Sequence, residues 1–306
     1  MKLFLLRFKT GLLFCCLFFT AEFGIAQHSV AHDWNEILLE AIRNDFARPT
    51  VHARNLFHHS IIAYDAWAAY EPQRDTYFLG KTTHGYSCDF LGINIFLDVE
   101  SARNETISYA SYSYIKSRYQ NSPDYFHTYN LMYNYMVQHG YNTNNLSTDY
   151  LNGGPAEFGN YLAQEIINYG YVDGSNELLN YENTYYTPIN PPLVMDDPGN
   201  PDIIDPNRWQ SLTLDSAIDQ SGNNVQNTIP FISPEWGNVD PFALSPDMYN
   251  TLTRDGQTYN VYFDTVQPAY LNPNDSSSWD SFYKWNHSLV SIWQSHLDPS
   301  DGVTWD

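Results

Sequence analysis

The sequence predicts a mainly α protein, in which a helical bundle carries a proline-rich irregular cover. Before residue 175, apolar side chains recur with helical spacing, whereas twelve of the seventeen prolines fall between Pro188 and Pro273. Proline removes a backbone donor and ends helices, so the second part excludes long helices. Aromatic residues interleave with these prolines and make up 16% of the chain, which favours an ordered cover packed on the helices over a free linker.

The segment 33–70 predicts two helices separated by a proline. Asp33 and Glu36 have the spacing of a capping box, which predicts the start of the first helix at this point. Pro49 disfavours helical geometry at the residue before it, so a second helix begins near Thr50 and a Glu-Pro pair ends it. The apolar faces of this hairpin comprise Trp34, Ile37, Leu38, Ala41 and Ile42 in the first helix and Ala53, Leu56, Phe57, Ile61, Tyr64, Trp67 and Ala68 in the second.

Charged and titratable residues interrupt the second of these helices. Arg54 and Asp65 lie among apolar residues, so we expect at least one to face the interior and to have a partner there. His52 and His59 are two turns apart, and His58 precedes Asp65 by the same separation. Either pair could supply metal ligands, but two ligands do not make a site. Hydrogen-bonded interior or boundary histidines are the favoured interpretation.

Further helices are predicted on both sides of the proline-rich segment. Three precede it and one follows it, at residues 98–118, 122–139, 154–169 and 277–295. Gly140 and Gly170 each follow a helix and are predicted to take the left-handed position after its end. A short strand pair is predicted on either side of Asp255–Gly256.

The first 26 residues have the pattern of a secretory signal. Basic residues precede an apolar run from Thr10 to Thr20, and small residues precede a cleavage point after Ala26. The run is too short to span a bilayer comfortably, so no stable membrane anchor is expected. Cleavage would leave Cys88 as the only cysteine, which excludes an internal disulfide. We therefore predict a secreted or periplasmic protein stabilised by its core.

The charge of the chain excludes two classes of partner. The signal contains three of the 14 basic residues and one of the 35 acidic residues, so its removal leaves a formal charge of −23. Such a chain repels nucleic acid and anionic lipid surfaces. The predicted regions are the signal at 1–26, helices at 27–175, the irregular cover at 176–275, and a terminal helix and turn at 276–306.

Three ordered motifs resemble those of a known family. They are Trp-Asn-Glu at 34–36 with Arg-Pro-Thr-Val-His-Ala-Arg at 48–54 and Ala-Tyr-Asp-Ala-Trp at 63–67, then Asp-Pro-Asn-Arg-Trp-Gln at 205–210, then residues 233–244. The pattern is similar to the N-terminal part of bacterial vanadium-dependent haloperoxidase-related proteins, in the type 2 phosphatidic acid phosphatase superfamily. The resemblance implies an incomplete haloperoxidase-like fold in a truncated chain.

The oxyanion-binding motifs of that family are absent from this sequence. The family holds vanadate or phosphate with a lysine followed by Arg-Pro, with Pro-Ser-Gly-His, and with Ser-Arg followed by a histidine, because cations neutralise the oxyanion. Arg48–Pro49 has Ala41 in place of the lysine. Pro299–Ser300 continues into Asp301, and Ser117–Arg118 has Asp124 in place of the histidine. No catalytic, cofactor-binding or metal-ligating residue is therefore assigned in this chain, and vanadate is expected only for the full-length family.

Two further groups of residues could bind a ligand, but a structural interpretation is favoured for each. Asp298, Ser300 and Asp301 have oxygen ligands for calcium, but the twelve-residue loop pattern is absent, so a capped turn is favoured. Arg208–Trp209 could form a cation–π platform for a ligand. An arginine that pins the proline-rich cover onto the helices is the favoured interpretation.

Two functions follow as hypotheses. In the first, the chain is the N-terminal scaffold of an exported haloperoxidase-like enzyme, inactive alone, whose C-terminal catalytic region binds vanadate and oxidises halide with peroxide. Phosphate-ester hydrolysis is the alternative reaction in the superfamily. In the second, the chain is a secreted α-helical binding protein, for example for glycans, which uses its 25 tyrosines and eight tryptophans. The first hypothesis predicts a large apolar face on the opening hairpin or on the terminal helix.

Overall fold

The computed structural model describes residues 28–94, 98–184, 186–195, 199–218, 220, 222, 224–254, 256–262, 282–298 and 300. The predicted signal segment and the predicted start of the terminal helix at Ser277 lie outside these ranges. Among the described helices, none is both long and apolar enough to cross a membrane.

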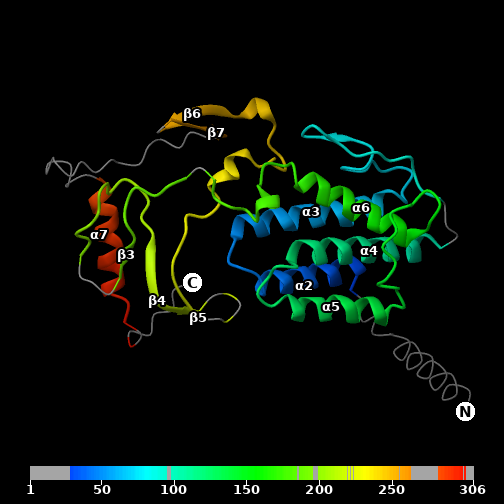
Figure 1. Cartoon of the computed structure of the whole chain (residues 1–306), viewed down its shortest axis with the longest axis horizontal. Coiled ribbons are helices and arrows are strands. Elements are labelled where there is room, and N and C mark those ends of the chain that lie inside the picture. The colour runs from blue at the N-terminus through cyan, green and yellow to red at the C-terminus, as the bar shows by residue number, and fades with distance from the viewer. Residues whose placement is uncertain are drawn as a thin grey trace, which may run out of the picture.

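Five helices form a bundle around a central member. Helix α4 contacts each of the other four, and Figure 1 shows it between the pair α3 and α6 and the pair α2 and α5. The core on which they converge is rich in aromatic side chains, including the fully buried Trp34, Tyr114 and Tyr119. The helices are α2 (Val30–Arg43), α3 (Pro49–Ala68), α4 (Val99–Tyr119), α5 (Tyr125–Gln138) and α6 (Pro155–Gly170).

Helix α2 begins earlier than the capping-box pattern predicted. Ser29 is its N-cap, because its backbone is extended and its Oγ accepts a hydrogen bond from the amide of His32 at 3.2 Å. Asp33 therefore lies inside the first turn, where its charge complements the helix dipole. The prediction of a start at Asp33 was wrong, because serine satisfies the free amides of the first turn as well as aspartate does.

The boundaries of the other bundle helices follow local chemistry. Pro49 occupies the first turn of α3, and Asp98 caps α4 by accepting from the amide of Ser101 at 3.0 Å. Helix α5 begins at Tyr125 instead of residue 122, because Asp124 is its cap. Gly140 has φ +75° and confirms the predicted left-handed residue after α5.

The part of the chain after residue 175 contains short strands and single turns of helix. Strands β6 (Asn250–Arg254) and β7 (Gln257–Val261) form the predicted antiparallel pair. A three-stranded sheet was not predicted; it consists of β3 (Leu193–Val194), β4 (Leu212–Ile218) and β5 (Asn224–Thr228). The remaining short elements are η1 (Glu177–Leu179), η2 (Pro234–Asn238), η3 (Pro246–Met248) and the earlier hairpin of β1 (Thr82–Thr83) and β2 (Tyr86–Ser87).

A few contacts join this later part to the bundle. The ring of Phe242 lies 4.7 Å from the ring of Phe57 on α3, measured between centroids. The side-chain amide of Gln220 donates from Nε2 to the carbonyl oxygen of Ile42 at 2.6 Å and to that of Asp45 at 2.8 Å, at the end of α2. These contacts position the later part beside α2 and α3.

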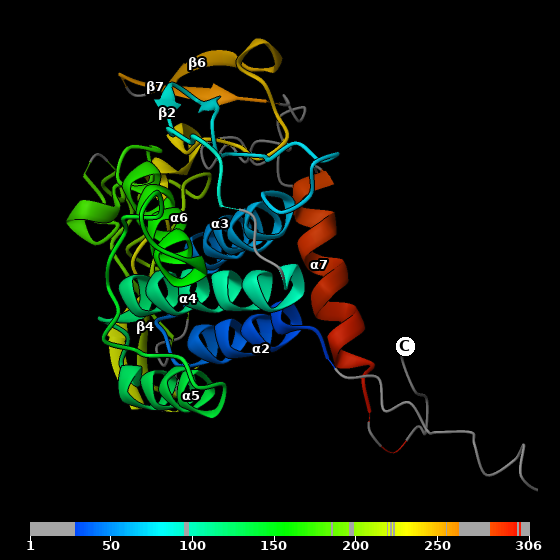
Figure 2. The same ribbon diagram turned by 90° about the vertical axis from the view of Figure 1, so that its right-hand side faces the viewer.

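Helix α7 (Phe282–Ser295) stands apart from the bundle. Figure 1 places it beyond the sheet of β3, β4 and β5, although in Figure 2 its projection overlaps the edge of the bundle. Its apolar side chains are exposed to solvent, with Trp285 at 56%, Val290 at 63% and Trp293 at 64%. No other described element packs extensively against α7.

Candidate functional site

The largest concentration of buried charge lies where α3, α4 and the end of α6 meet. We call it the arginine cluster, and it consists of Arg54, His58, Arg118, Asp173 and Glu177. Arg54 and His58 are one turn apart on α3, so both face Arg118 on α4. Asp173 and Glu177 follow α6. All but Glu177 are less than 9% exposed, and the Glu177 side chain is 12% exposed.

Arg54 is held by both carboxylates. Its Nε donates to Asp173 Oδ2, and its Nη2 donates to Glu177 Oε2 and to the carbonyl oxygen of Gly170, each at 2.8 Å. Burial alone would lower the pKa of Arg54. The charges of Asp173 and Glu177 outweigh this effect and raise the pKa, so the guanidinium stays charged.

Arg118 completes the pairing from the opposite helix. Its Nη1 donates to the same Oε2 atom of Glu177, and its guanidinium carbon lies 5.2 Å from the centroid of the Tyr114 ring. Glu177 therefore bridges the two arginines. Because Glu177 begins the short turn η1, this bridge attaches the chain beyond α6 to the bundle core.

His58 lies between the two arginines as a neutral ring. Its Nδ1 is 3.4 Å from Arg118 Nη2, so it accepts from the guanidinium, and its Nε2 lies 3.6 Å from Asp173 Oδ2. Burial lowers the pKa of His58 well below its usual value, and the neighbouring Arg54 and Arg118 charges lower it further. The cluster thus contains two positive charges, two negative charges and a neutral imidazole.

Gly170 has a different role from the predicted one. The predicted left-handed conformation after α6 was wrong, because Gly170 is the last residue of the helix and has no positive φ. Instead, the guanidinium groups of Arg54 and Arg118 pass directly over it, and a Cβ atom there would clash with both. A larger residue at this position would displace the two guanidinium groups from their places against the helix backbone.

The arginine cluster does not fit an oxyanion. A vanadate or phosphate site leaves its guanidinium groups uncompensated until the anion arrives. Here Asp173 and Glu177 already occupy the charge-bearing edges of Arg54 and Arg118, and either carboxylate would repel an incoming anion. The chemistry available to this cluster is therefore structural, namely the attachment of the segment after α6 to α3 and α4.

The residues of the three partial oxyanion motifs have different structural roles. Arg48 precedes α3 and pairs with Asp45, with 3.1 Å between Nη2 and Oδ2, while Arg118 belongs to the cluster. Asp124 caps α5. The amide of Ser300 donates to Asp298 Oδ1 at 2.8 Å, as a capped turn predicts, and Asp301 lies outside the described residues.

The histidines and the aspartate of α3 confirm the interior interpretation. His52 Nε2 lies 2.9 Å from the carbonyl oxygen of Phe46. His59 Nδ1 and Nε2 lie 3.1 Å from Asn35 Oδ1 and 2.9 Å from Ser111 Oγ, and burial lowers the pKa of His59 to about 4. The Asp65 carboxylate accepts from three successive backbone amides at 2.6, 2.8 and 2.8 Å, those of Tyr77, Phe78 and Leu79.

Arg208, Trp209 and Cys88 also lie within the described residues. Arg208 forms an ion pair with Asp205 in its own loop, with 3.7 Å between Nε and Oδ2, and Trp209 packs edge-on against Phe231. The role of Arg208 in pinning the cover stays a prediction. Cys88 is buried and free, and burial raises its thiol pKa to about 12, so it is a poor nucleophile.

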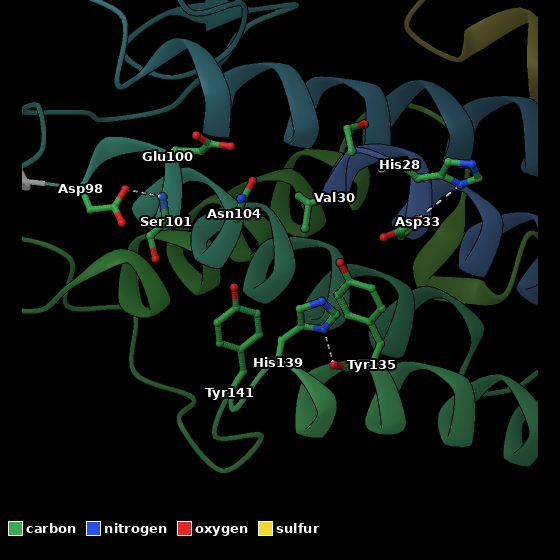
Figure 3. Close-up of a pocket in the computed structure, with 11 residues that line it drawn as sticks. His28, Val30, Asp33, Asp98, Glu100, Ser101, Asn104, Tyr135, His139 and Tyr141 are labelled. Carbon is green, nitrogen blue, oxygen red and sulfur yellow. Dashed lines mark hydrogen bonds and ion pairs between the residues drawn. The ribbon is translucent and has the colours of Figure 1, made fainter. Parts of the chain in front are cut away.

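A second group was missed by the sequence reasoning. His28, His32 and Asp33 gather at the start of α2, with ligand atoms within 4.8 Å of one another. His28 and Asp33 border a cavity of about 600 Å³ that Figure 3 shows between α2, α4 and the end of α5. The sequence feature that indicates this group is the four-residue spacing of His28 and His32. A helix that begins at Asp33 would leave His32 outside it, whereas the start at Val30 places His32 in the first turn.

Comparisons with known proteins return the class that the motifs resemble. The chain is similar to the apo-type bacterial vanadium-dependent chloroperoxidase, with 18% identity, a TM-score of 0.45, and coverage of 67% of this chain and 42% of that chain. It is similar to the holo-type structure with 19% identity, a TM-score of 0.43, and coverage of 62% and 38%. The chain thus spans less than half the length of either protein. No protein-family model and no curated protein matches the sequence.

Proposed function

We propose that this chain is the scaffold part of an exported vanadium-dependent haloperoxidase-like protein, in which another region of the same protein holds the vanadate. The proposal begins from the three ordered motifs of the sequence. It assigns no catalytic step to the residues of this chain. Export rests on the predicted signal and its cleavage after Ala26.

The main support for the proposal is that the motif residues of α3 make structural contacts. Every arginine, histidine and aspartate of α3 is engaged in holding the fold. Arg54 and His58 belong to the arginine cluster, His52 and His59 form neutral hydrogen bonds, and Asp65 accepts from the backbone of a loop. A catalytic group must be available to substrate or cofactor. These side chains are buried and already paired, which favours a scaffold function.

The apolar face of α7 supports the proposal that this chain packs against another region of the same protein. Trp285, Val290 and Trp293 are all more than half exposed, and an amphipathic helix of this kind is stable only when its apolar face is covered. The later part of the chain would form a cover on the bundle, and α7 would pack on the vanadate-binding region. The reaction of the whole protein would be peroxide-dependent halide oxidation, with phosphate-ester hydrolysis as the alternative.

One experiment tests the proposal at the level of the gene and the protein. The DNA after codon 306 is sequenced, and vanadate binding is measured by ⁵¹V NMR for this chain alone and for any longer product. We expect the longer frame to encode the lysine, arginine and histidine motifs, and only its product to bind vanadate. A stop codon at this position, together with a monomeric chain that binds no vanadate, would contradict the proposal and favour a secreted binding protein.

A matched pair of variants tests the part assigned to α7. Trp293→Asp is expected to weaken assembly with the vanadate-binding region more than tenfold, because it places a charge on the exposed apolar face. Ser291→Asp changes charge equally on the same helix and serves as the control. Equal effects of the two substitutions on co-purification would show that this face is not the contact.

A further inference from the structure

The geometry points to a divalent transition-metal site at the start of α2, formed by His28, His32 and Asp33. These residues offer two imidazole nitrogens and one carboxylate oxygen, which is the ligand set that Zn²⁺ accepts in three-ligand sites with one open position. We propose that the site binds Zn²⁺. It belongs to the surface of the bundle and is independent of the arginine cluster.

Local structure brings the three ligands together. Ser29 caps α2, so His28 lies just before the helix while His32 and Asp33 lie in its first turn. His32 Nδ1 is 3.5 Å and His28 Nδ1 is 4.0 Å from Asp33 Oδ1. The edge of a tetrahedron with metal–ligand bonds of about 2.0–2.1 Å is about 3.4 Å. The first distance already matches this edge, the second exceeds it by about half an ångström, and all three ligand atoms lie within 4.8 Å of one another.

The ligands are free to make that shift. The side chains of His28, His32 and Asp33 are 65%, 45% and 36% exposed, and the two imidazole rings are edge to face with centroids 4.1 Å apart. Each histidine contacts the same carboxylate, so the three side chains already converge without a metal. The buried histidines of α3, by contrast, have both ring nitrogens committed or enclosed.

The cavity beside the ligands adds a second, electrostatic argument. Its described lining includes the carboxylates of Asp33, Asp98 and Glu100 and contains no lysine or arginine. Figure 3 shows His28 and Asp33 at one end of this cavity and Asp98 and Glu100 at the other. A recess lined by one sign of charge raises the local concentration of cations.

The choice of metal follows from the ligands. Two imidazoles favour zinc, copper and nickel over magnesium and calcium, which prefer oxygen ligands. Copper would bind more tightly than zinc at equal availability, as the general order of divalent affinities requires. The inference therefore covers late first-row divalent ions, and Zn²⁺ and Co²⁺ are the probes.

The test is calorimetric titration of the untagged full chain with Zn²⁺, followed by the visible spectrum of its Co²⁺ form. We expect one Zn²⁺ per chain and the absorption of a tetrahedral cobalt centre, with no comparable binding of Mg²⁺. His32→Ala and Asp33→Asn are each expected to weaken Zn²⁺ binding more than tenfold. His127→Ala is the matched control, because His127 is also exposed and lies 3.6 Å from a carboxylate oxygen of Glu40.

Thermal unfolding provides a second readout and guards against folding defects. A metal that binds only the folded state raises the melting temperature, so Zn²⁺ should stabilise the parent chain and the His127 variant but not the His32 variant. In chelator, all three should melt alike, because the substituted side chains are exposed. Equal Zn²⁺ affinity in the parent chain and His32→Ala would mean that zinc binds the acidic surface generally, and it would overturn the proposal.

Discussion

The helical bundle and the part of the chain after residue 175 differ in how they bury their side chains. In the bundle, large aromatic residues such as Trp34 and Tyr114 are fully buried, and the charged groups among them are paired. In the later part, Phe242, Leu252 and Trp293 are 65%, 49% and 64% exposed. The bundle therefore has the features of a self-sufficient core, whereas the later segments depend on attachment to something else.

The arginine cluster is the strongest point of that attachment. Asp173 and Glu177 come from the segment that leaves the bundle, and the guanidinium groups they bind belong to α3 and α4. A second segment of the later part is attached at the same junction, because the backbone amide of Asp240 donates to the carbonyl oxygen of Asp173 at 2.9 Å. The comparison between the two regions can be tested at three places: the arginine cluster, the bundle core, and the contact between Phe242 and the bundle.

The largest effect is expected from Arg118→Ala. This substitution leaves the Glu177 carboxylate buried with one fewer partner, which costs about 3–5 kcal/mol for a buried pair. Urea denaturation measures the loss in the free energy of unfolding. The control is Arg43→Ala, which breaks an exposed ion pair with Glu40 worth less than about 1 kcal/mol. Similar losses for both variants would mean that the cluster is not a structural junction.

A smaller effect is expected from acidification of the bundle core. In the folded chain His59 has a pKa of about 4, whereas an unfolded histidine has a pKa of about 6.5. Between these values the unfolded state binds more protons, so the free energy of unfolding falls as the pH falls. His59 alone should reduce it by about 2 kcal/mol from pH 7 to pH 5.

A variant isolates this contribution from that of other groups. His59→Gln should show a pH dependence that is shallower by that amount, measured as urea midpoints at several pH values. His127→Gln, at an exposed position on α5, should follow the parent chain. An unchanged slope in the His59 variant would mean that the buried ring is not the source of acid sensitivity.

The smallest effect is expected at the outer contact, from Phe242→Ala. The ring of Phe242 packs against Phe57 and Tyr77, and an aromatic pair of this kind contributes about 0.5–1.5 kcal/mol. Limited proteolysis of the residues after 242 should become faster while the bundle remains intact. Phe126→Ala, at a position 75% exposed on α5, should leave both rates unchanged. Faster cleavage within the bundle would contradict the division into two regions.

Much of the bundle could be predicted from sequence because its signals are local. The helical spacing before residue 175, Pro49 at the break between α2 and α3, and Gly140 after α5 each act within a few residues. Even the error at α2 was local, since Ser29 and Asp33 are alternative caps four residues apart. The strand pair on either side of Gly256 was predicted for the same reason.

The arginine cluster could not be predicted because its members come from distant segments. Asp173 and Glu177 carry no sequence signal that connects them to Arg54, and Gly170 looks like an ordinary helix end until two guanidinium groups are seen above it. The pairing of β3 with β4 was also missed, since it joins Leu193 to Leu212 in parallel. Parallel pairing leaves no turn pattern in the sequence.

The sequence by itself determined the mainly α class, the positions of the bundle helices, the acidic charge and the resemblance to haloperoxidase-related proteins. Only the tertiary structure decided what the charged residues of α3 do. An arginine or histidine on an apolar helix can bind a ligand or neutralise a neighbour, and local sequence does not distinguish the two. The distinction depends on whether a carboxylate from another segment reaches it, as Asp173 and Glu177 reach Arg54 here.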